Sequence, residues 1–127
     1  MSVYKGDISW PGTSIGLTNS PMVSGAAALV SLPIGLRVNV YANGPLDFTL
    51  DIDGYFAPDV ARTAVGLIPL ANTRRFLETR PSPGYYSAQG ALAAGVERSW
   101  KLTDVTYEGV TIPGEAVVLL ATVTALP

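Results

Sequence analysis

The sequence predicts an all-β fold, a compact antiparallel β-sandwich or β-barrel with little or no helix. Apolar and polar residues alternate with a period of two in several segments, whereas the 3.6-residue period of an amphipathic helix is hard to find. Thirteen Gly and ten Pro, scattered without a period, place turns between these segments. Hydrophobic residues make up 48% of the chain and charged residues 14%, which is enough apolar material for a core and too little charge for disorder.

The length of 127 residues is typical of one domain and leaves no room for two well-filled cores. We therefore expect a single β domain over residues 1–127. Residues 57–63 are expected to interrupt the strands, because they follow the Gly-Tyr-Phe end of one predicted strand and precede the next. This interruption divides the domain into two halves, residues 1–57 and 63–127.

The first strands are predicted at residues 3–10 and 27–32. Three consecutive Ala residues at 26–28 could begin a helix, but the β-branched Val30 and then Pro33 end it within two turns. Both segments are therefore assigned to strands.

The clearest local prediction is a β-hairpin made of residues 36–42 and 46–53. Apolar residues occupy every second position in both segments, and in the second one they are Leu46, Phe48, Leu50 and Ile52. Asn43 and Gly44 lie between the segments, and Asn-Gly is typical of two-residue hairpin turns because both residues tolerate positive φ. We therefore expect the two segments to pair side by side.

Further strands are predicted at residues 64–70, 75–80 and 96–103, the last with one face in water. Residues 80–95 (RPSPGYYSAQGALAAG) are rich in Pro, Gly, Ser and Ala and have no stable period. This composition is typical of a long surface loop, and long loops often carry function.

Residues 116–125 (AVVLLATVTA) are apolar on both faces and β-branched in places. Such a segment predicts a central strand that is buried on both faces. An unpaired carboxylate has no access to water there. We therefore expect an aspartate at Val118 or at Leu119 to abolish folding.

The absence of His and Cys excludes most enzyme chemistry. Without them there is no Ser-His-Asp or Cys-His relay, no thiolate, no haem or iron-sulfur cluster and none of the usual structural zinc ligand sets. Paired carboxylates could still hydrolyse glycosides, but no acidic pair lies at loop ends flanked by aromatic residues. We therefore expect a protein that is not an enzyme and that binds no cofactor.

The net charge and the hydropathy of the chain argue against several classes of partner. A net charge of -2 and a pI near 4.9 lack the basic footprint of a nucleic-acid-binding protein. The first twenty residues lack the apolar segment of a signal peptide, and the apolar run at 116–127 is shorter than the roughly 20 residues that span a bilayer. The sequence thus predicts no nucleic-acid partner, no membrane insertion and no signal peptide in this chain.

Four short motifs resemble a β module that is repeated in secreted and surface proteins of actinobacteria and related bacteria, here named the DTR/GYF module. Residues 75–80 (RFLETR) are similar to its RLLDTR strand, and residues 112–124 to its VPxxAxAVVLNVTVT strand. Residues 10–12 (WPG) are similar to its YPxG turn, and residues 51–56 (DIDGYF) to its closing DVxGYF strand. The halves are permuted, since the GYF half comes first here. The resemblance implies a β fold and an extracellular setting, and no activity.

The acidic face of the second hairpin strand, Asp47, Asp51 and Asp53, is a candidate calcium site, because hard cations bind several carboxylate oxygens. Its spacing does not fit an EF-hand loop, since Gly54 follows Asp53 directly and aromatic residues come next. The favoured interpretation is an ordinary solvated or salt-bridged strand face.

Arg74, Arg75 and Arg80 form a basic cluster beside Glu78. One interpretation is a site for an anion or a partner. The favoured one is structural, because charges within apolar strands need partners of opposite sign. We therefore expect Arg75 or Arg80 to pair with Glu78 or Asp51.

The candidate interaction residues are Tyr85, Tyr86 and Trp100, together with Trp10 and Tyr107. Adjacent tyrosines in a loop rich in Pro and Gly cannot both point into one core, so at least one is expected to be exposed. Exposed aromatic side chains serve protein contacts and glycan stacking alike.

A mean hydropathy of +0.32, with only eight basic and ten acidic residues, predicts that apolar surface stays exposed. We therefore expect a structural or adhesive surface subunit whose partners are copies of itself or adjacent subunits. A bacteriophage decoration, tail or fibre protein and a repeat of a bacterial surface protein both fit, which implies a virion or an extracellular surface. The alternative is a carbohydrate- or cell-wall-binding module that binds a surface glycan. Serines at positions 85 and 86 are expected to weaken assembly.

Overall fold

The chain consists of β-strands and connections in the part that the computed structural model describes, residues 1–9, 11–12, 23–32, 37–59, 64–81 and 90–126. No helix occurs in these ranges, so the predicted all-β class is confirmed. In particular, the described residues contain no helix long and apolar enough to cross a membrane.

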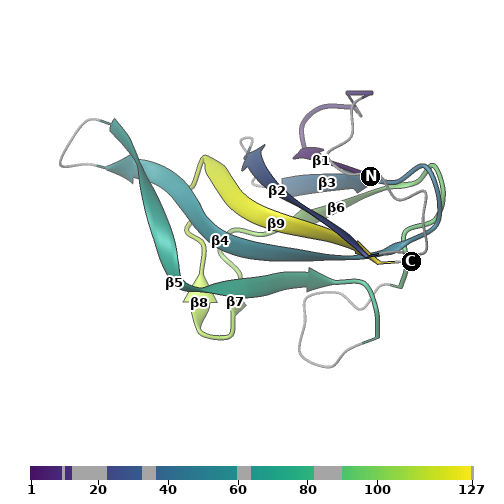
Figure 1. Cartoon of the computed structure of the whole chain (residues 1–127). Helices are drawn as coiled ribbons and strands as arrows, with labels where there is room; N and C mark the ends of the chain where they lie inside the picture. The colour runs from purple at the N-terminus through teal and green to yellow at the C-terminus, as the bar shows by residue number, and fades with distance from the viewer. Residues whose placement is uncertain (10, 13–22, 33–36, 60–63, 82–89, 127) are drawn as a thin grey trace.

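Two antiparallel sheets form the body of the molecule (Figure 1). The first has the order β1-β3-β6 and consists of β1 (Ser2–Lys5), β3 (Arg37–Tyr41) and β6 (Glu97–Lys101). The second has the order β2-β9-β4-β5 and consists of β2 (Ser24–Ser31), β9 (Val118–Leu126), β4 (Asp47–Asp59) and β5 (Ala64–Glu78). A small hairpin joins β7 (Thr106–Tyr107) to β8 (Val110–Thr111).

The hydrophobic core lies between the two sheets. Phe48 of β4 and Trp100 of β6 meet across it edge to face, with ring centroids 5.5 Å apart and planes at 71°. The connections add Leu92, Leu102 and Ile112, which are buried in the same cluster. The arrangement is a β-sandwich.

The predicted hairpin of residues 36–42 and 46–53 is wrong. β3 pairs with β1 and β6, whereas β4 pairs with β9 and β5, so the two segments belong to different sheets. The alternation itself was interpreted correctly, since Val38 and Val40 of β3 are buried. Phe48, Leu50 and Ile52 of β4 are buried as well. The two apolar faces meet across the core, and strands from other parts of the chain complete each sheet.

β9 is the central strand of its sheet, as predicted, because β2 and β4 pair with its two edges. The expectation that both of its faces are buried is wrong. Leu119 and Ala121 point into the core, whereas Val118 and Leu120 are only half-buried on the outer face. A two-layer sandwich covers one face of each sheet. An aspartate at Val118 is therefore no longer expected to abolish folding.

β5 joins the two strands that were predicted at residues 64–70 and 75–80. β4 runs to Asp59, so residues 57–59 belong to a strand and not to the interruption expected at 57–63. Residues 60–63 of that prediction lie outside the described residues. β1 ends at Lys5, well before the predicted residue 10. Half of the predicted loop at 80–95, residues 82–89, lies outside the described residues.

The outer part of the β4–β5 hairpin forms a projecting arm, defined as residues 54–59 of β4 and 64–69 of β5. The register between the two strands shifts after Leu50 and again between Ile52 and Gly54, where residues 70–73 of β5 are left out of the ladder. Beyond this irregularity the pairing is regular as far as Asp59 and Ala64. Figure 1 shows the arm reaching away from the first sheet.

Gly54 stands where the arm leaves the sheet. A Cβ atom on this residue would lie 2.9 Å from the carbonyl oxygen of Ile68 and 3.1 Å from Cα of Pro69. Both neighbours are backbone atoms and cannot rotate away. The close approach of β5 thus requires glycine, which explains the Gly of the DIDGYF segment by local geometry.

We expect the variant Gly54→Ala to lower the free energy of unfolding by about 1–2 kcal/mol, because the added methyl group has to displace the β5 backbone. Gly66→Ala is the matched control, since a Cβ there meets nothing within 4 Å. This control is expected to leave stability unchanged or to raise it by about 0.5 kcal/mol through a stiffer unfolded chain. Urea unfolding of both variants measures the difference; equal effects would show that the arm leaves the sheet by another path.

Candidate functional site

A cluster of four charged residues, Asp51, Arg75, Glu78 and Arg80, lies along the β4–β5 pairing, toward the end of the ladder opposite the arm. Asp51 and Arg75 face each other in the ladder, and their side chains form a two-pronged contact, with Nε to Oδ1 at 2.8 Å and Nη2 to Oδ2 at 3.2 Å. This geometry is the strong form of an arginine–carboxylate pair. It ties the two strands together through their side chains.

Glu78 is the buried centre of this charge cluster. Its Oε1 accepts a hydrogen bond from Nε of Arg80 at 2.8 Å, and its Oε2 accepts one from Nη2 of Arg80 at 2.9 Å and one from Nη1 of Arg75 at 3.3 Å. The hydrogen bonds from Arg80 hold the pKa of Glu78 below its usual range, while burial acts in the opposite direction. The carboxylate is therefore charged at neutral pH and fully engaged by the two guanidinium groups.

Thr79 closes the same end of the β4–β5 ladder. Its hydroxyl accepts a hydrogen bond from the backbone N–H of Phe48 at 2.9 Å and donates one to Oδ1 of Asp47 at 2.7 Å. Its own N–H donates to the carbonyl oxygen of Phe48 at 3.1 Å. These contacts satisfy buried backbone groups at the start of β4, which is a structural role.

The three aspartates considered for calcium point to different partners. Asp47 accepts from Thr79, Asp51 pairs with Arg75, and Asp53 accepts from the hydroxyls of Thr73 and Thr122. Within the described ranges, no group of three or more His, Cys, Asp or Glu side chains could hold a metal ion. The arrangement favours the interpretation as a paired strand face.

Trp100 is not available as an interaction residue, because it is buried in the core against Phe48. The alternation of residues 96–103 puts Trp100 on the same face as Leu102, which is also buried, and that signal outweighs its aromatic character. Tyr107 lies half-buried against Phe76, with ring centroids 5.2 Å apart. Tyr85, Tyr86 and Trp10 lie outside the described residues.

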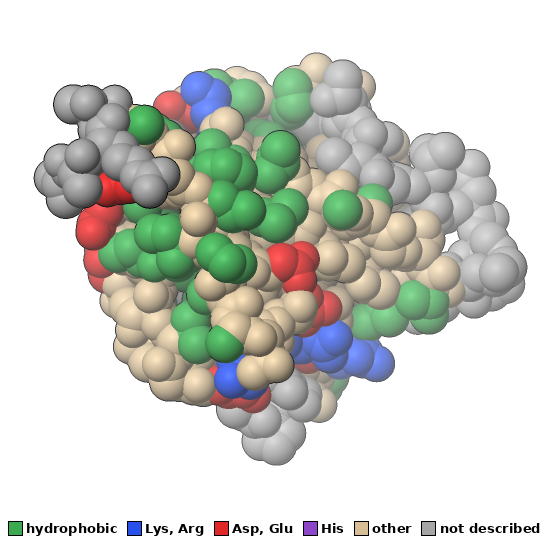
Figure 2. All heavy atoms as spheres, turned by 60° about the vertical axis from the view of Figure 1, so that its left-hand side comes forward, with side chains coloured by type: hydrophobic (Ala, Val, Ile, Leu, Met, Phe, Trp, Pro, Cys, Tyr) green, Lys and Arg blue, Asp and Glu red, His purple; other side chains and the backbone are tan. Residues whose placement is uncertain are grey.

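An apolar outer face, which the sequence analysis did not locate, extends over the second sheet and the arm. Opposed residues of an antiparallel pair share a face, so the registers place Leu29 beside Leu120 and align Val118, Phe56 and Leu67 in one row. Leu29 and Leu67 are exposed. Figure 2, in which the arm side of Figure 1 comes forward, shows hydrophobic side chains gathered on this side beside charged ones.

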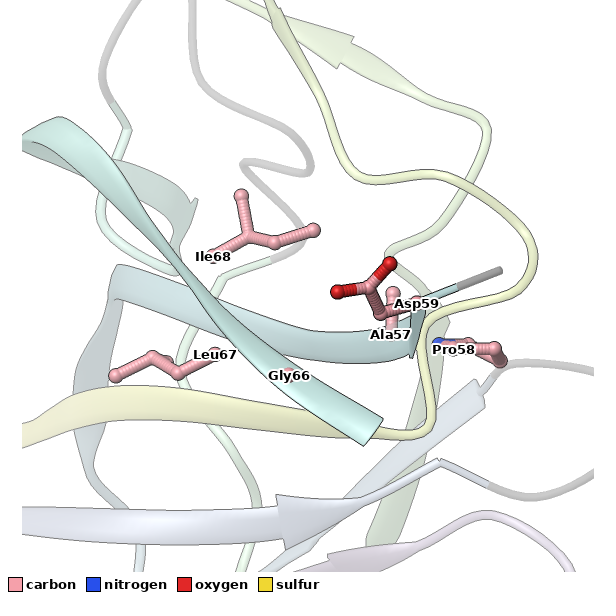
Figure 3. Close-up of a pocket in the computed structure, with 6 residues that line it drawn as sticks. All are labelled: Ala57, Pro58, Asp59, Gly66, Leu67 and Ile68. Atoms are coloured by element: carbon pink, nitrogen blue, oxygen red, sulfur yellow. The ribbon is translucent and has the colours of Figure 1, made fainter. Parts of the chain in front are cut away.

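The arm also bears a hollow of about 250 Å³, lined by Ala57, Pro58, Asp59, Gly66, Leu67 and Ile68 (Figure 3). Gly66 leaves a gap in its wall because it carries no side chain. Ile68 and Leu67 point away from each other to the two faces of β5. The side chains that line the hollow are apolar except for Asp59, so the hollow can accept an aliphatic side chain.

The signal for this surface was present in the sequence. Residues 64–71 (AVGLIPLA) contain no polar side chain, although a strand with one face in water normally alternates. Such a run indicates either burial on both faces or exposure of apolar surface. Only the position of β5 at the edge of the sheet decides between them.

Comparisons with known proteins identify no relative: no protein-family model, no curated protein and no solved structure matches the chain. Within the structure, the DTR-like, GYF-like and AVVLLATVT segments fall on β5, β4 and β9, which are neighbours in one sheet. Segments far apart in the sequence thus lie side by side.

Proposed function

We propose that this chain is a non-enzymatic structural or adhesive subunit of a surface, such as a bacteriophage decoration, tail or fibre protein or a repeat of a bacterial surface protein. Its partners are copies of itself or adjacent subunits, on a virion or an extracellular surface. The proposal agrees with the absence of His and Cys and with the engagement of the cluster carboxylates by arginines.

The observation that carries the proposal is the uncovered apolar surface of the arm and the outer face. Val65, Leu67 and Ile68 of the arm are 54%, 48% and 43% exposed. Scattered exposed apolar residues need no explanation, but a contiguous group on one projecting element usually marks a contact with another chain. Apolar surface that is exposed in the single chain is expected of a subunit whose neighbours cover it in the assembly.

The DTR/GYF resemblance supports the same proposal. Its strand segments meet in one sheet as β9, β4 and β5. The permuted order of the two halves is compatible with the pairing of these strands, because a sheet depends on which strands pair and not on their order in the chain. The resemblance therefore contributes an extracellular setting to the proposal.

The alternative, a carbohydrate- or cell-wall-binding module, now depends on Tyr85 and Tyr86, since Trp100 is buried. Glycan binding by aromatic stacking requires exposed rings over a polar groove. The described outer face offers Phe56, which is half-buried among aliphatic side chains, and no such groove.

Sedimentation equilibrium combined with a glycan array separates the two functions. We expect the mass of the chain to rise above the monomer value as its concentration approaches about 1 mM, the range of weak contacts, and we expect no glycan to be retained. A strict monomer that retains a glycan, and loses it when Tyr85 and Tyr86 are changed to Ser, would replace the subunit by the binding module.

A further inference from the structure

We propose that two copies of this chain associate through the free edge of β5 in the arm. Residues 64–70 of the two copies pair antiparallel around a two-fold axis at Leu67. The proposal rests on the proposed subunit function and names the contact that this function uses.

The free edge of β5 in the arm is open and carries no charged residue, and its protection is confined to Pro69 and the irregular register at residues 70–73. β5 is the last strand of the order β2-β9-β4-β5, and among the described strands only β4 pairs with it. An edge strand presents unpaired N–H and C=O groups, and proteins usually guard them with charged side chains, prolines or bulges. Residues 64–73 contain no charged side chain, and within 64–70 only Pro69 interrupts the run. The edge therefore offers a template that another strand can complete.

The side chains of the arm complement a second copy. In a pairing centred on Leu67, Ile68 of each copy lies across from Gly66 of the other, and Val65 lies across from Pro69. The large Ile68 side chain then stands beside the gap that Gly66 leaves in the wall of the hollow. A volume of about 250 Å³ can receive an aliphatic side chain. Each copy supplies both the protruding Ile68 side chain and the gap at Gly66, because the two surfaces of a two-fold contact are identical.

The absence of charge on the β5 edge also favours a second copy of this chain over a charged molecule as the binding partner. Because residues 64–73 carry no charge, pairing two of these edges brings no like charges together. A nucleic acid or a strongly charged peptide would find no group of opposite sign on this edge. The uncharged edge thus fits its own copy.

The contact between the two β5 edges is small, so self-association has to be measured at high protein concentration. Seven residues of strand extend roughly 24 Å, and one paired edge covers much less than the roughly 800 Å² per partner of a stable complex. We therefore expect a weak dimer that forms at high concentration in solution. On a particle or a surface, neighbouring contacts would hold the subunits together and raise their effective concentration.

Charge substitution at Leu67 tests the two-fold pairing, because this residue faces its own copy. Leu67→Lys and Leu67→Glu are each expected to weaken self-association at least tenfold, since like charges then stand opposite each other. A one-to-one mixture of the two variants should associate again. Val96→Lys is the matched control: Val96 is 44% exposed, close to the 48% of Leu67, and lies beside β6 of the other sheet. It should associate like the unchanged chain.

Cross-linking provides a readout that does not depend on the effect of a charge. The chain has no Cys, so Leu67→Cys introduces a single thiol. Facing residues of an antiparallel pair have Cα atoms about 5 Å apart, within the range of a disulfide. Diamide should oxidise two such thiols to an intermolecular disulfide much faster in Leu67→Cys than in Val96→Cys.

The outcomes separate this inference from the function on which it rests. Recovery of association in the Lys–Glu mixture, together with selective cross-linking at position 67, supports the two-fold edge. If the unchanged chain associates but both charged variants associate equally well, or if Val96→Cys cross-links as fast as Leu67→Cys, the edge pairing is overturned and the subunit function stands. If the unchanged chain is a monomer at every concentration and no partner is recovered from its native surface, the subunit function fails as well.

Discussion

Replacing Leu119 by Asp is expected to abolish folding. The Leu119 side chain is fully buried in β9, between Val30 of β2 and Tyr55 of β4 in the ladder. No cation lies opposite it in these strands, so an aspartate there would be an uncompensated charge in an apolar environment. The cost exceeds roughly 4 kcal/mol, which approaches the lower end of the roughly 5–15 kcal/mol that stabilises a native domain. Circular dichroism and proteolysis should show an unfolded chain.

Leu120→Asp is the control for this experiment, because it places the same substitution on the next residue of the same strand. Leu120 lies on the outer face, where an aspartate reaches water. We expect this variant to fold, with stability lowered by about 1 kcal/mol through lost contact with its neighbours. A folded Leu119→Asp, or an unfolded Leu120→Asp, would contradict the assignment of the two faces of β9.

Glu78→Ala is expected to lower the free energy of unfolding by about 2–3 kcal/mol. The substitution removes a buried carboxylate that accepts hydrogen bonds from Arg75 and Arg80, and it leaves the guanidinium groups with fewer acceptors. Glu115→Ala changes the same residue type at an exposed position and should be near neutral. Urea unfolding at neutral pH measures both.

The effect of Glu78 depends on pH in a direction that follows from its pKa. Hydrogen bonds from Arg80 lower the folded-state pKa of Glu78 below the ordinary value of 4.5. Its contribution to stability is therefore fully present above pH 4.5 and is lost as the pH falls through the lower folded-state pKa.

The difference in stability between the unchanged chain and Glu78→Ala should thus be constant from neutral pH to about pH 5 and shrink below it. Unfolding curves in steps of pH measure this difference. A gap that stays constant into strong acid would show that the carboxylate acts through packing and not through its charge.

Alternation in the sequence was sufficient to predict the all-β class and the buried face of the clearly alternating segments, such as residues 46–53. Phe48, Leu50 and Ile52 are buried as their period of two requires. A strand carries its own inward and outward faces, so this property depends on adjacent residues and is visible locally.

The pairing partners of each strand could not be predicted from its own sequence, because they depend on the whole chain. The Asn43–Gly44 signal predicted a hairpin, yet β3 and β4 pair with strands that lie far away in the sequence. A turn signal describes one short connection, whereas pairing reflects the burial that the strands of both sheets achieve together. For the same reason, sequence analysis predicted burial of both faces of β9 and missed the exposure of its outer face.

The arm shows the same division between local and long-range information. Its apolar composition is plain in residues 64–71. Whether such a run is buried or exposed depends on its place in the sheet. β5 is the edge strand, and its residues 64–69 pair with β4 on the far side of the irregular register at Gly54. Composition thus predicted that apolar surface would remain, while the strand order located it, because exposure depends on which strands come to lie beside a segment.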